Sequence, residues 1–470
     1  QFQSRAPGVA PGQRACNGGR SEALVRGIGT GRSVRRNGKG AVSVASAAEK
    51  MLPRVWAARP LLRSSSLGPL TAARLPACHA NAPSGRRFPT SAAAVTAEGA
   101  ENVEDEHEIM FYSMRHAATV TLKEMHQFGA QANNKRALIL AAQFLHEELP
   151  IRLARRVREL KKLPYGLGDT KSITQVRKMY EKSFFEIRRH AKPITPDLEA
   201  NFTKLMDNMM VEHNNVQATI AAGLQELDRG RTDMGETGQQ RLPFDFGQFL
   251  DRFYLSRVGM RVLVGQHIML HHPQEGFIGI IQSECQPAFV CGHAIEDAQA
   301  ICKLSYGVAP HVRLEGNIDM KLPYIPEHLH YMFFELLKNS MRAVVERAKE
   351  KYPEKELRMG DLPPVVVVFA EGAEDATIKI SDKGGGIPRS GMNRLWTYSF
   401  TTAGNTSEKI ERLKDEKAKP VMAGFAHGLP LSRIHARAFG GDIQVMSMQG
   451  YGTDVYIHLS KMGDVEVAVP

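Results

Sequence analysis

The chain has 470 residues, of which 43% are hydrophobic, 7% aromatic and 24% charged, the composition of a globular protein with two or three domains and neither a disordered nor a fibrous one. No apolar run approaches the roughly 18 to 20 residues of a membrane-spanning helix, so we expect no membrane span. The formal net charge of +11 divides into +13 for residues 1–97 and −2 for the remainder. Because the positive charge lies outside the expected folded part, a nucleic-acid partner is not predicted.

Residues 1–97 form a predicted leader. Between Met51 and Ala97 there are six arginines, no acidic residue and many Ser, Ala and Leu, a composition typical of an organellar transit peptide. A basic tail without a targeting role is the alternative. We expect Met51 to be the true start, because residues 1–50 begin without Met and are rich in Gly and Arg.

The five cysteines lie at positions 16, 78, 285, 291 and 302, and no two of them have the C-x-x-C spacing of a zinc or redox site. The spacing therefore predicts a reduced intracellular protein. Cys285, Cys291 and Cys302 are expected to be small core or surface residues.

Residues 109–270 are predicted to be helical, because apolar residues recur at helical spacing, as in residues 138–145. Breaks are expected where Gly and Pro cluster, at residues 163–168, 193–196 and 230–240. These helices predict an all-α, four-helix-bundle-like domain over residues 98–275.

From about residue 277, strand-like runs alternate with helices. Residues 365–369, 376–380 and 454–459 are the clearest strands. They predict an α/β sandwich domain over residues 276–470, so the expected fold class is α+β.

One predicted helix, beginning at Pro326, carries two separate faces. Glu335, Asn339 and Arg342 form a polar line at i, i+4 and i+7. Such a line alone is most simply a solvent-exposed face. The core face of the same helix is predicted from Leu329, Met332, Phe333, Leu336 and Leu337.

Three later segments give that polar line a context. Asp382 ends a predicted strand and is followed by three glycines, which let a ligand approach the backbone closely. Residues 424–428 are glycine-rich and open a helix, whose N–H groups and dipole suit phosphates. Thr453 then supplies a hydroxyl just after Gly452, at the start of the last strand. Each segment alone is a weak signal.

In this order, the four segments resemble the ATP-binding fold shared by type II topoisomerases, the heat-shock chaperone of that class, mismatch-repair ATPases and sensor histidine kinases. Residues 148–156, 249–257 and 335–343 narrow the match, since they look like the mitochondrial α-ketoacid dehydrogenase kinases. The resemblance covers the chain from about residue 110 onward. It implies that residues 276–470 are an ATP-binding kinase domain and that residues 98–275 are a regulatory domain that binds lipoyl domains.

The resemblance implies roles for individual residues. Glu335 would be the general base, Asn339 would hold Mg²⁺ against the ATP phosphates, and Asp382 would accept a hydrogen bond from the adenine amino group. K⁺ is a second cation that the resemblance brings into consideration. The other expected ATP-binding positions, some of them beneath a mobile lid, are Arg342, Gly384, Gly386, Thr401, Thr402, Gly424, Phe425, Ala426, His427, Gly428, Leu429 and Thr453.

A second site is implied in the helical domain, where a small carboxylate such as pyruvate would inhibit. The matching positions are His213, Ser256, Arg257 and Arg261. Arginine suits a carboxylate because its planar fork binds both oxygens, although an interhelical salt bridge is an equally good interpretation. A sensor histidine kinase would need His213 as phosphoacceptor, but the Glu and Pro that usually follow such a histidine are missing, so direct transfer to serine is favoured.

The resemblance therefore predicts a protein serine kinase of the mitochondrial matrix that phosphorylates the E1α subunit of the pyruvate dehydrogenase complex and inactivates it. It also implies a homodimer that is recruited by the lipoyl domains of E2. The branched-chain α-ketoacid dehydrogenase kinase is the alternative within the family. A catalytically silent scaffold that binds ATP and lipoyl domains is a further alternative, because Ala426 replaces a family glycine and Tyr331 replaces a histidine of animal members.

Overall fold

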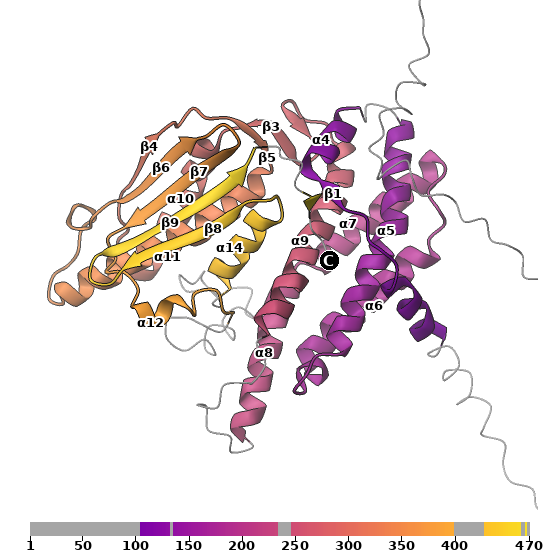
Figure 1. Ribbon diagram of the computed structural model, residues 1–470, viewed down its shortest axis with the longest axis horizontal. Helices are drawn as coiled ribbons and strands as arrows, with labels where there is room; N and C mark the ends of the chain where they lie inside the picture. Colours follow the sequence, from indigo (N-terminus) through magenta and orange to yellow (C-terminus); the bar gives the residue numbers. More distant parts are fainter. Residues whose placement is uncertain (1–103, 132–134, 234–245, 399–426, 462–465, 468–470) are drawn as a thin grey trace, which may run out of the picture. The chain divides into compact units, whose positions relative to one another are not determined.

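The computed structural model describes residues 104–131, 135–233, 246–398, 427–461 and 466–467, which all belong to one compact unit (Figure 1). The predicted leader lies outside the described residues. The same holds for the expected lid and for five expected ATP-binding positions, Thr401, Thr402, Gly424, Phe425 and Ala426.

The N-terminal part of the described chain is helical. Its helices are α4 (Leu122–Ala130), α5 (Lys135–Lys161), α6 (Lys171–Arg189), α7 (Pro196–Glu212), α8 (Val216–Asp233) and α9 (Gly247–Leu270), with a short 3-10 helix, η1 (Leu167–Asp169). The breaks predicted at residues 163–168 and 193–196 are confirmed, whereas α8 runs on to Asp233 and the rest of the third predicted break, at residues 230–240, lies outside the described residues. A two-residue strand, β1 (Val120–Thr121), interrupts the expected helical stretch and pairs with β10 (Glu466–Val467).

Helices α5 and α9 lie at the centre of this region. Helix α5 contacts α6, α7 and α9, and α6 also contacts α8. Tyr180, Phe184 and Phe253 are fully buried where these helices meet. The helical character of the region is confirmed, while the four-helix arrangement remains a prediction.

The C-terminal part is built on a five-stranded sheet with the order β4 (Val312–Gly316), β6 (Val365–Glu371), β7 (Asp375–Asp382), β9 (Gly452–Ser460) and β8 (Asp442–Met448). Only β4 and β6 are parallel. A smaller sheet joins β2 (Phe277–Ile278), β3 (Ile281–Cys285) and β5 (Leu322–Tyr324). The three predicted strands therefore all lie in the large sheet.

One face of the large sheet is covered by helices α10 (Pro287–Tyr306), α11 (Pro326–Lys351) and α14 (Gly428–Arg437), as Figure 1 shows. Strand residues alternate accordingly, with Ala376, Ile378 and Ile380 of β7 buried. Two short elements, η2 (Met359–Asp361) and α12 (Arg389–Met392), lie between α11 and α14 in the chain, and residues 104–113 are also helical. The mixed fold with a helical N-terminal region and a C-terminal sheet region is confirmed.

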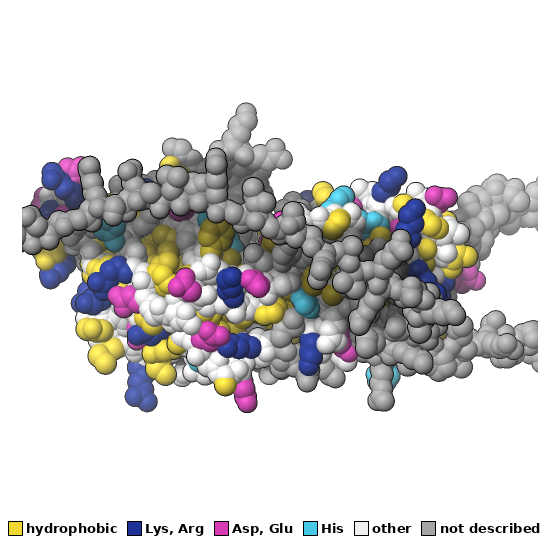
Figure 2. Space-filling view, turned by 90° about the horizontal axis from the view of Figure 1, so that it is seen from above, with side chains coloured by type: hydrophobic (Ala, Val, Ile, Leu, Met, Phe, Trp, Pro, Cys, Tyr) yellow, Lys and Arg dark blue, Asp and Glu magenta, His cyan; other side chains and the backbone are white. Residues whose placement is uncertain are grey.

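Further expectations concern the cysteines, a membrane span, the surface charge and the domain boundary. Cys285, Cys291 and Cys302 are free and buried, so they are core residues. None of the described helices has the length and apolarity to cross a membrane. On the face shown in Figure 2, basic and acidic side chains are interspersed over the described surface. The boundary at residues 275/276 remains a prediction, although α9 ends at Leu270 and β2 begins at Phe277.

Candidate active site

Helix α11 carries the central residues of the candidate site. Pro326 occupies its first turn, where a missing N–H costs nothing, and Glu327 complements the helix dipole. Glu335 and Asn339 lie one turn apart on this helix. The predicted core face is confirmed, since its members are all buried: Leu329, Met332, Phe333, Leu336 and Leu337.

The Glu335 carboxylate is held by a lysine that the sequence analysis did not identify. Lys338 Nζ donates to Glu335 Oε1 at 2.6 Å, and the two side chains are only 7% and 13% exposed. The Lys338 ammonium also lies 5.0 Å from the ring centroid of Phe334. Because the pair is largely removed from water, its hydrogen bond fixes the direction of the carboxylate.

The second oxygen of Glu335 faces the first residue of α14. A Cβ added to Gly428 would overlap Glu335 Oε2, so only a glycine lets the carboxylate approach the chain here. The N-terminal turn of a helix favours negative charge. Glu335 is thus positioned between Lys338 on its own helix and the start of α14.

Asp382 ends strand β7 and is buried. Its Oδ1 accepts a hydrogen bond from the Gly384 amide at 2.8 Å, and the Ser340 hydroxyl of α11 is a further partner. Burial raises the pKa of the Asp382 carboxyl above its ordinary value, and these hydrogen bonds oppose that rise. Thr453 lies directly opposite Asp382 on β9.

The glycine turn after β7 is shaped by its protein neighbours. A Cβ on Gly384 would overlap Ala343 of α11, and one on Gly386, whose φ is +70°, would overlap the Met448 carbonyl. Both glycines therefore let the turn pack closely between α11 and the β8–β9 hairpin. Their expected contact with a nucleotide stays a prediction.

A hydroxyl network joins this turn to the hairpin. Ser447 Oγ lies 2.9 Å from Thr453 Oγ1 and accepts from the Ile387 amide at 2.8 Å. The network fixes Thr453 beside Asp382, and Ser447 is a member of it that the sequence analysis did not predict.

The His427 side chain lies in the protein interior, although the sequence motif predicts an ATP-binding position there. Its ring is buried, with ring centroids 5.2 Å from Tyr398 and 6.0 Å from Tyr254 of α9. Burial lowers the pKa of His427 to about 4, so the ring is neutral at pH 7. The side chain therefore packs in the core, and Leu429 also packs against the core.

Arg342 and Tyr331 flank Glu335 along α11. Arg342 Nε lies 3.6 Å from Glu346 Oε2, so the predicted ATP ligand pairs here with a carboxylate of its own helix. The Tyr331 ring centroid is 4.6 Å from that of His435 on α14. Burial, together with the charge of Glu335, raises the pKa of the Tyr331 hydroxyl.

The residues of the predicted small-acid pocket lie where α9 contacts the end of α7. Arg257 Nη2 donates to the His213 carbonyl at 2.8 Å, and Arg261 Nη1 donates to the Met210 carbonyl at 3.3 Å. Arg257 is 5% exposed, and no carboxylate among the described residues stabilises its charge, whereas Glu327 stabilises that of Arg261. The described residues therefore do not form an interhelical salt bridge to Arg257, which was the alternative interpretation.

Further polar groups surround Arg257. His213 Nε2 lies 2.9 Å from Ser183 Oγ, and its ring packs edge-on against Tyr180. Burial, and then the charge of Arg257, lowers the pKa of His213 to about 4. Within the described chain, Ser256 Oγ and the Tyr180 hydroxyl are buried without a hydrogen-bond partner. Tyr180 and Ser183 were not predicted, because they lie on α6, far from the α9 motif in sequence.

The same geometry argues against a phosphoacceptor role for His213. The side chain is 7% exposed, its Nε2 is occupied by Ser183, and its ring is covered by Tyr180. A histidine that receives phosphate must reach the ATP, so direct transfer to a substrate serine remains the better interpretation.

Comparisons with known proteins identify the families that the two regions of the chain resemble. Residues 119–282 match the family model of the mitochondrial branched-chain alpha-ketoacid dehydrogenase kinase. Residues 324–462 match the histidine kinase-, DNA gyrase B- and HSP90-like ATPase family. The second match covers α11, the glycine turn and the start of α14, which are the elements that position Glu335 and Asp382.

Several curated relatives are named [pyruvate dehydrogenase (acetyl-transferring)] kinase, mitochondrial. The Arabidopsis thaliana protein is 44% identical over 75% of this chain and 92% of its own length. The Drosophila melanogaster protein is 36% identical over 75% and 84%, and human isozyme 3 is 35% identical over the same shares. The chain therefore belongs to the family of mitochondrial pyruvate dehydrogenase kinases, with an ATPase region of the histidine kinase, gyrase B and HSP90 type.

Proposed function

We propose that this chain is a protein serine kinase that transfers the γ-phosphoryl group of ATP to the E1α subunit of the pyruvate dehydrogenase complex and inactivates it. The observation that carries the proposal is the placement of Glu335. Its carboxylate is fixed by Lys338 and by the start of α14, one helical turn from Asn339.

This placement suits the chemistry of phosphoryl transfer, which depends mainly on positioning and on charge stabilisation. The serine oxygen forms a bond to Pγ while the bond from Pγ to the bridging oxygen of ADP breaks. Glu335 would accept the proton that the serine hydroxyl loses. Because both carboxylate oxygens have fixed neighbours, the base would be held in one direction before the substrate binds.

The residues present are compatible with ATP and Mg²⁺. Asp382 is a buried acceptor at the expected adenine position, with its backbone partners already in place. Asn339 offers a carboxamide oxygen, a hard ligand of the kind that Mg²⁺ takes together with phosphate oxygens and water. Bound Mg²⁺ would neutralise phosphate charge. K⁺ is proposed from family resemblance alone.

We also propose that the pocket around Arg257 binds a small carboxylate such as pyruvate and inhibits the kinase. A buried guanidinium with only neutral partners among the described residues lacks a compensating negative charge. A carboxylate would supply that charge together with a bidentate partner.

Partners and location are proposed from family membership. The relatives are named mitochondrial, and residues 51–97 have the composition of a transit peptide, so we propose import into the mitochondrial matrix. Recruitment by the lipoyl domains of E2 and formation of a homodimer are proposed on the same basis.

The test compares two substrates. Residues 98–470 would be incubated with radiolabelled ATP and with purified pyruvate E1 and branched-chain E1 side by side. We expect label on pyruvate E1α. Label on branched-chain E1 alone would instead support the kinase after which the helical-region family model is named. ATP binding without label on either substrate would indicate a silent scaffold.

A further inference from the structure

A cluster of metal-ligating side chains lies between α7 and α9, apart from the candidate active site. His267 lies in the last turn of α9 and His271, four residues later, caps the helix with helical backbone angles, so both imidazoles project from the same side. Glu199 of α7 faces them, with its Oε1 2.8 Å from His271 Nε2 and 3.4 Å from His267 Nε2. One possible ligand atom from each of the three residues lies within 4.8 Å of the others.

The cluster is buried and has little competing charge. Glu199 is 5% exposed and His267 is 2% exposed, while His271 is half-buried. Within the described chain, Glu199 forms ion pairs with these two histidines and with no lysine or arginine. A buried carboxylate without a fixed cation attracts one.

The donor set matches a particular class of ion. We propose that Glu199, His267 and His271 bind a divalent transition metal of the Zn²⁺ class. Zn²⁺ takes His nitrogen at about 2.0–2.1 Å and carboxylate oxygen at a similar distance, and two His with one Glu is a known ligand set with one open position. Tetrahedral bonds of that length place ligand atoms about 3.4 Å apart. The separations of 2.8 and 3.4 Å need only small side-chain movements to reach this value.

The imidazole ligands also distinguish this site chemically from the Mg²⁺ site proposed at Asn339. Mg²⁺ prefers oxygen ligands and keeps several waters, whereas imidazole suits Zn²⁺, Cu²⁺ and Ni²⁺. Thr203, one turn after Glu199, lies 2.9 Å from both Glu199 Oε1 and His267 Nε2. Its oxygen therefore faces the ligand atoms themselves, including His271 Nε2 at 3.4 Å, and would be a fourth donor to the ion.

Metal binding would exchange one set of bonds for another. At present His271 Nε2 shares a hydrogen with Glu199 Oε1. The ion would replace that hydrogen and bond to both atoms, and the displaced proton would move to His271 Nδ1 or leave to solvent. Because each imidazole must offer an unprotonated Nε2, binding should weaken as the pH falls.

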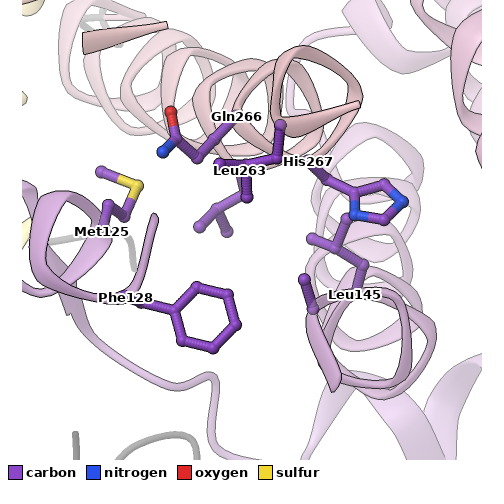
Figure 3. Close-up of a pocket in the computed structure, with 8 residues that line it drawn as sticks. Met125, Phe128, Leu145, Leu263, Gln266 and His267 are labelled. Carbon is purple, nitrogen blue, oxygen red and sulfur yellow. The ribbon is translucent and has the colours of Figure 1, made fainter. Parts of the chain in front are cut away.

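The position of the cluster gives the ion a structural consequence. It lies near the start of α7 and the end of α9, whereas Arg257 and Arg261 hold the other end of the same helix contact. His267 also borders a small apolar cavity of about 20 Å³, together with Met125, Phe128, Leu145, Leu263 and Gln266 (Figure 3). A bound ion would therefore fix α7 against α9 beside this cavity.

The test is a titration of the chelator-treated full chain with Co²⁺, a spectroscopic substitute for Zn²⁺, in the absence of nucleotide. We expect one equivalent to bind with the visible absorption bands of a tetrahedral Co²⁺ site. His271→Ala and Glu199→Gln should each weaken this binding roughly tenfold or more. His272→Ala is the matched control, because His272 is the exposed neighbour of His271 and should leave the bands unchanged.

Thermal unfolding gives a second readout. Zn²⁺ should raise the Tm of the wild-type chain and of His272→Ala, but not that of His271→Ala. Absence of stoichiometric Co²⁺ uptake by the wild type would overturn the proposal. Equal uptake by wild type and His271→Ala would also overturn it, since the ion would then be bound elsewhere in the chain.

Discussion

The two halves of the molecule bury charged groups in opposite ways. In the sheet region, the Asp382 carboxylate accepts one of its hydrogen bonds from an amide only two residues later. In the helical region, the Arg257 guanidinium reaches the His213 carbonyl, 44 residues earlier in the chain. The site at the strand end thus combines a local turn with partners from α11 and β9, whereas the site between helices depends entirely on which helix faces meet. The first kind leaves a compact sequence motif and the second does not.

Substitution of Gly428 tests the sheet-region site most severely. Gly428→Ala places a methyl group where Glu335 Oε2 now lies and should displace that carboxylate. A misplacement of about 1 Å can lower a catalytic rate about 100-fold, so we expect kcat to fall by 10- to 100-fold while ATP still binds. Gly292→Ala, on α10 with open space around it, is the control and should retain kcat. An unchanged kcat in Gly428→Ala would refute the packing of Glu335 against α14.

Loss of the Asp382 charge should affect nucleotide binding. Asp382→Asn keeps the shape of the side chain but removes a charged acceptor worth about 1.5–3 kcal/mol, which corresponds to roughly a 10- to 100-fold higher Kd for ATP. Calorimetric titration with ATP would measure this change. Asp454→Asn, next in the chain to Thr453, should leave the Kd unaltered, and equal effects of the two variants would argue against a direct role for Asp382.

The helical-region pocket can be tested without disturbing catalysis. Arg257→Met removes the buried charge but keeps much of the side-chain length, so inhibition by pyruvate should weaken about tenfold or more while uninhibited activity is retained. Kinase assays over a range of pyruvate concentrations would show the shift. Arg252→Met, at an exposed position of the same helix, should be inhibited like the wild type. Unaltered inhibition of Arg257→Met would place the inhibitor elsewhere.

The smallest effect concerns pH and compares one histidine from each region. His213 and His427 have a pKa of about 4 in the folded chain, against about 6.5 when unfolded. Between pH 6.5 and 4 only the unfolded chain takes up these protons, so the free energy of unfolding should fall as the pH falls through this window. Each histidine contributes up to about 1.4 kcal/mol per pH unit. Urea unfolding at several pH values should show a shallower slope in His213→Gln and in His427→Gln.

Much of the sheet-region site was predictable because its signals are local. The Pro326 helix and the strand that leads to Asp382 follow from periodicity and short spacing, whereas the pairing of Thr453 with Asp382 follows from the register of β7 and β9. Lys338 escaped prediction, since a lysine beside core leucines is usually exposed. Its burial depends on Glu335, three residues earlier, which forms an ion pair with the ammonium, and on Phe334, four residues earlier, whose ring contacts it.

The helical region was less predictable, because its contacts join residues that lie far apart in the sequence. The sequence pattern placed Arg257 and Arg261 on one helix, but not Tyr180 and Ser183 of α6 near them. The cluster of Glu199 with His267 and His271 left no motif either, because its carboxylate and its imidazoles are 68 and 72 residues apart. Helical periodicity identifies a buried face and does not identify the helix that covers it.

The most direct test of the account is the Glu335→Gln variant, assayed for labelled phosphate on pyruvate E1α and, separately, for ATP binding. Gln keeps the shape of the side chain but cannot accept the serine proton. We predict that labelling falls by a factor of 10² to 10⁴ while ATP binding is retained. Labelling at the wild-type rate would contradict the assignment of Glu335 as the base.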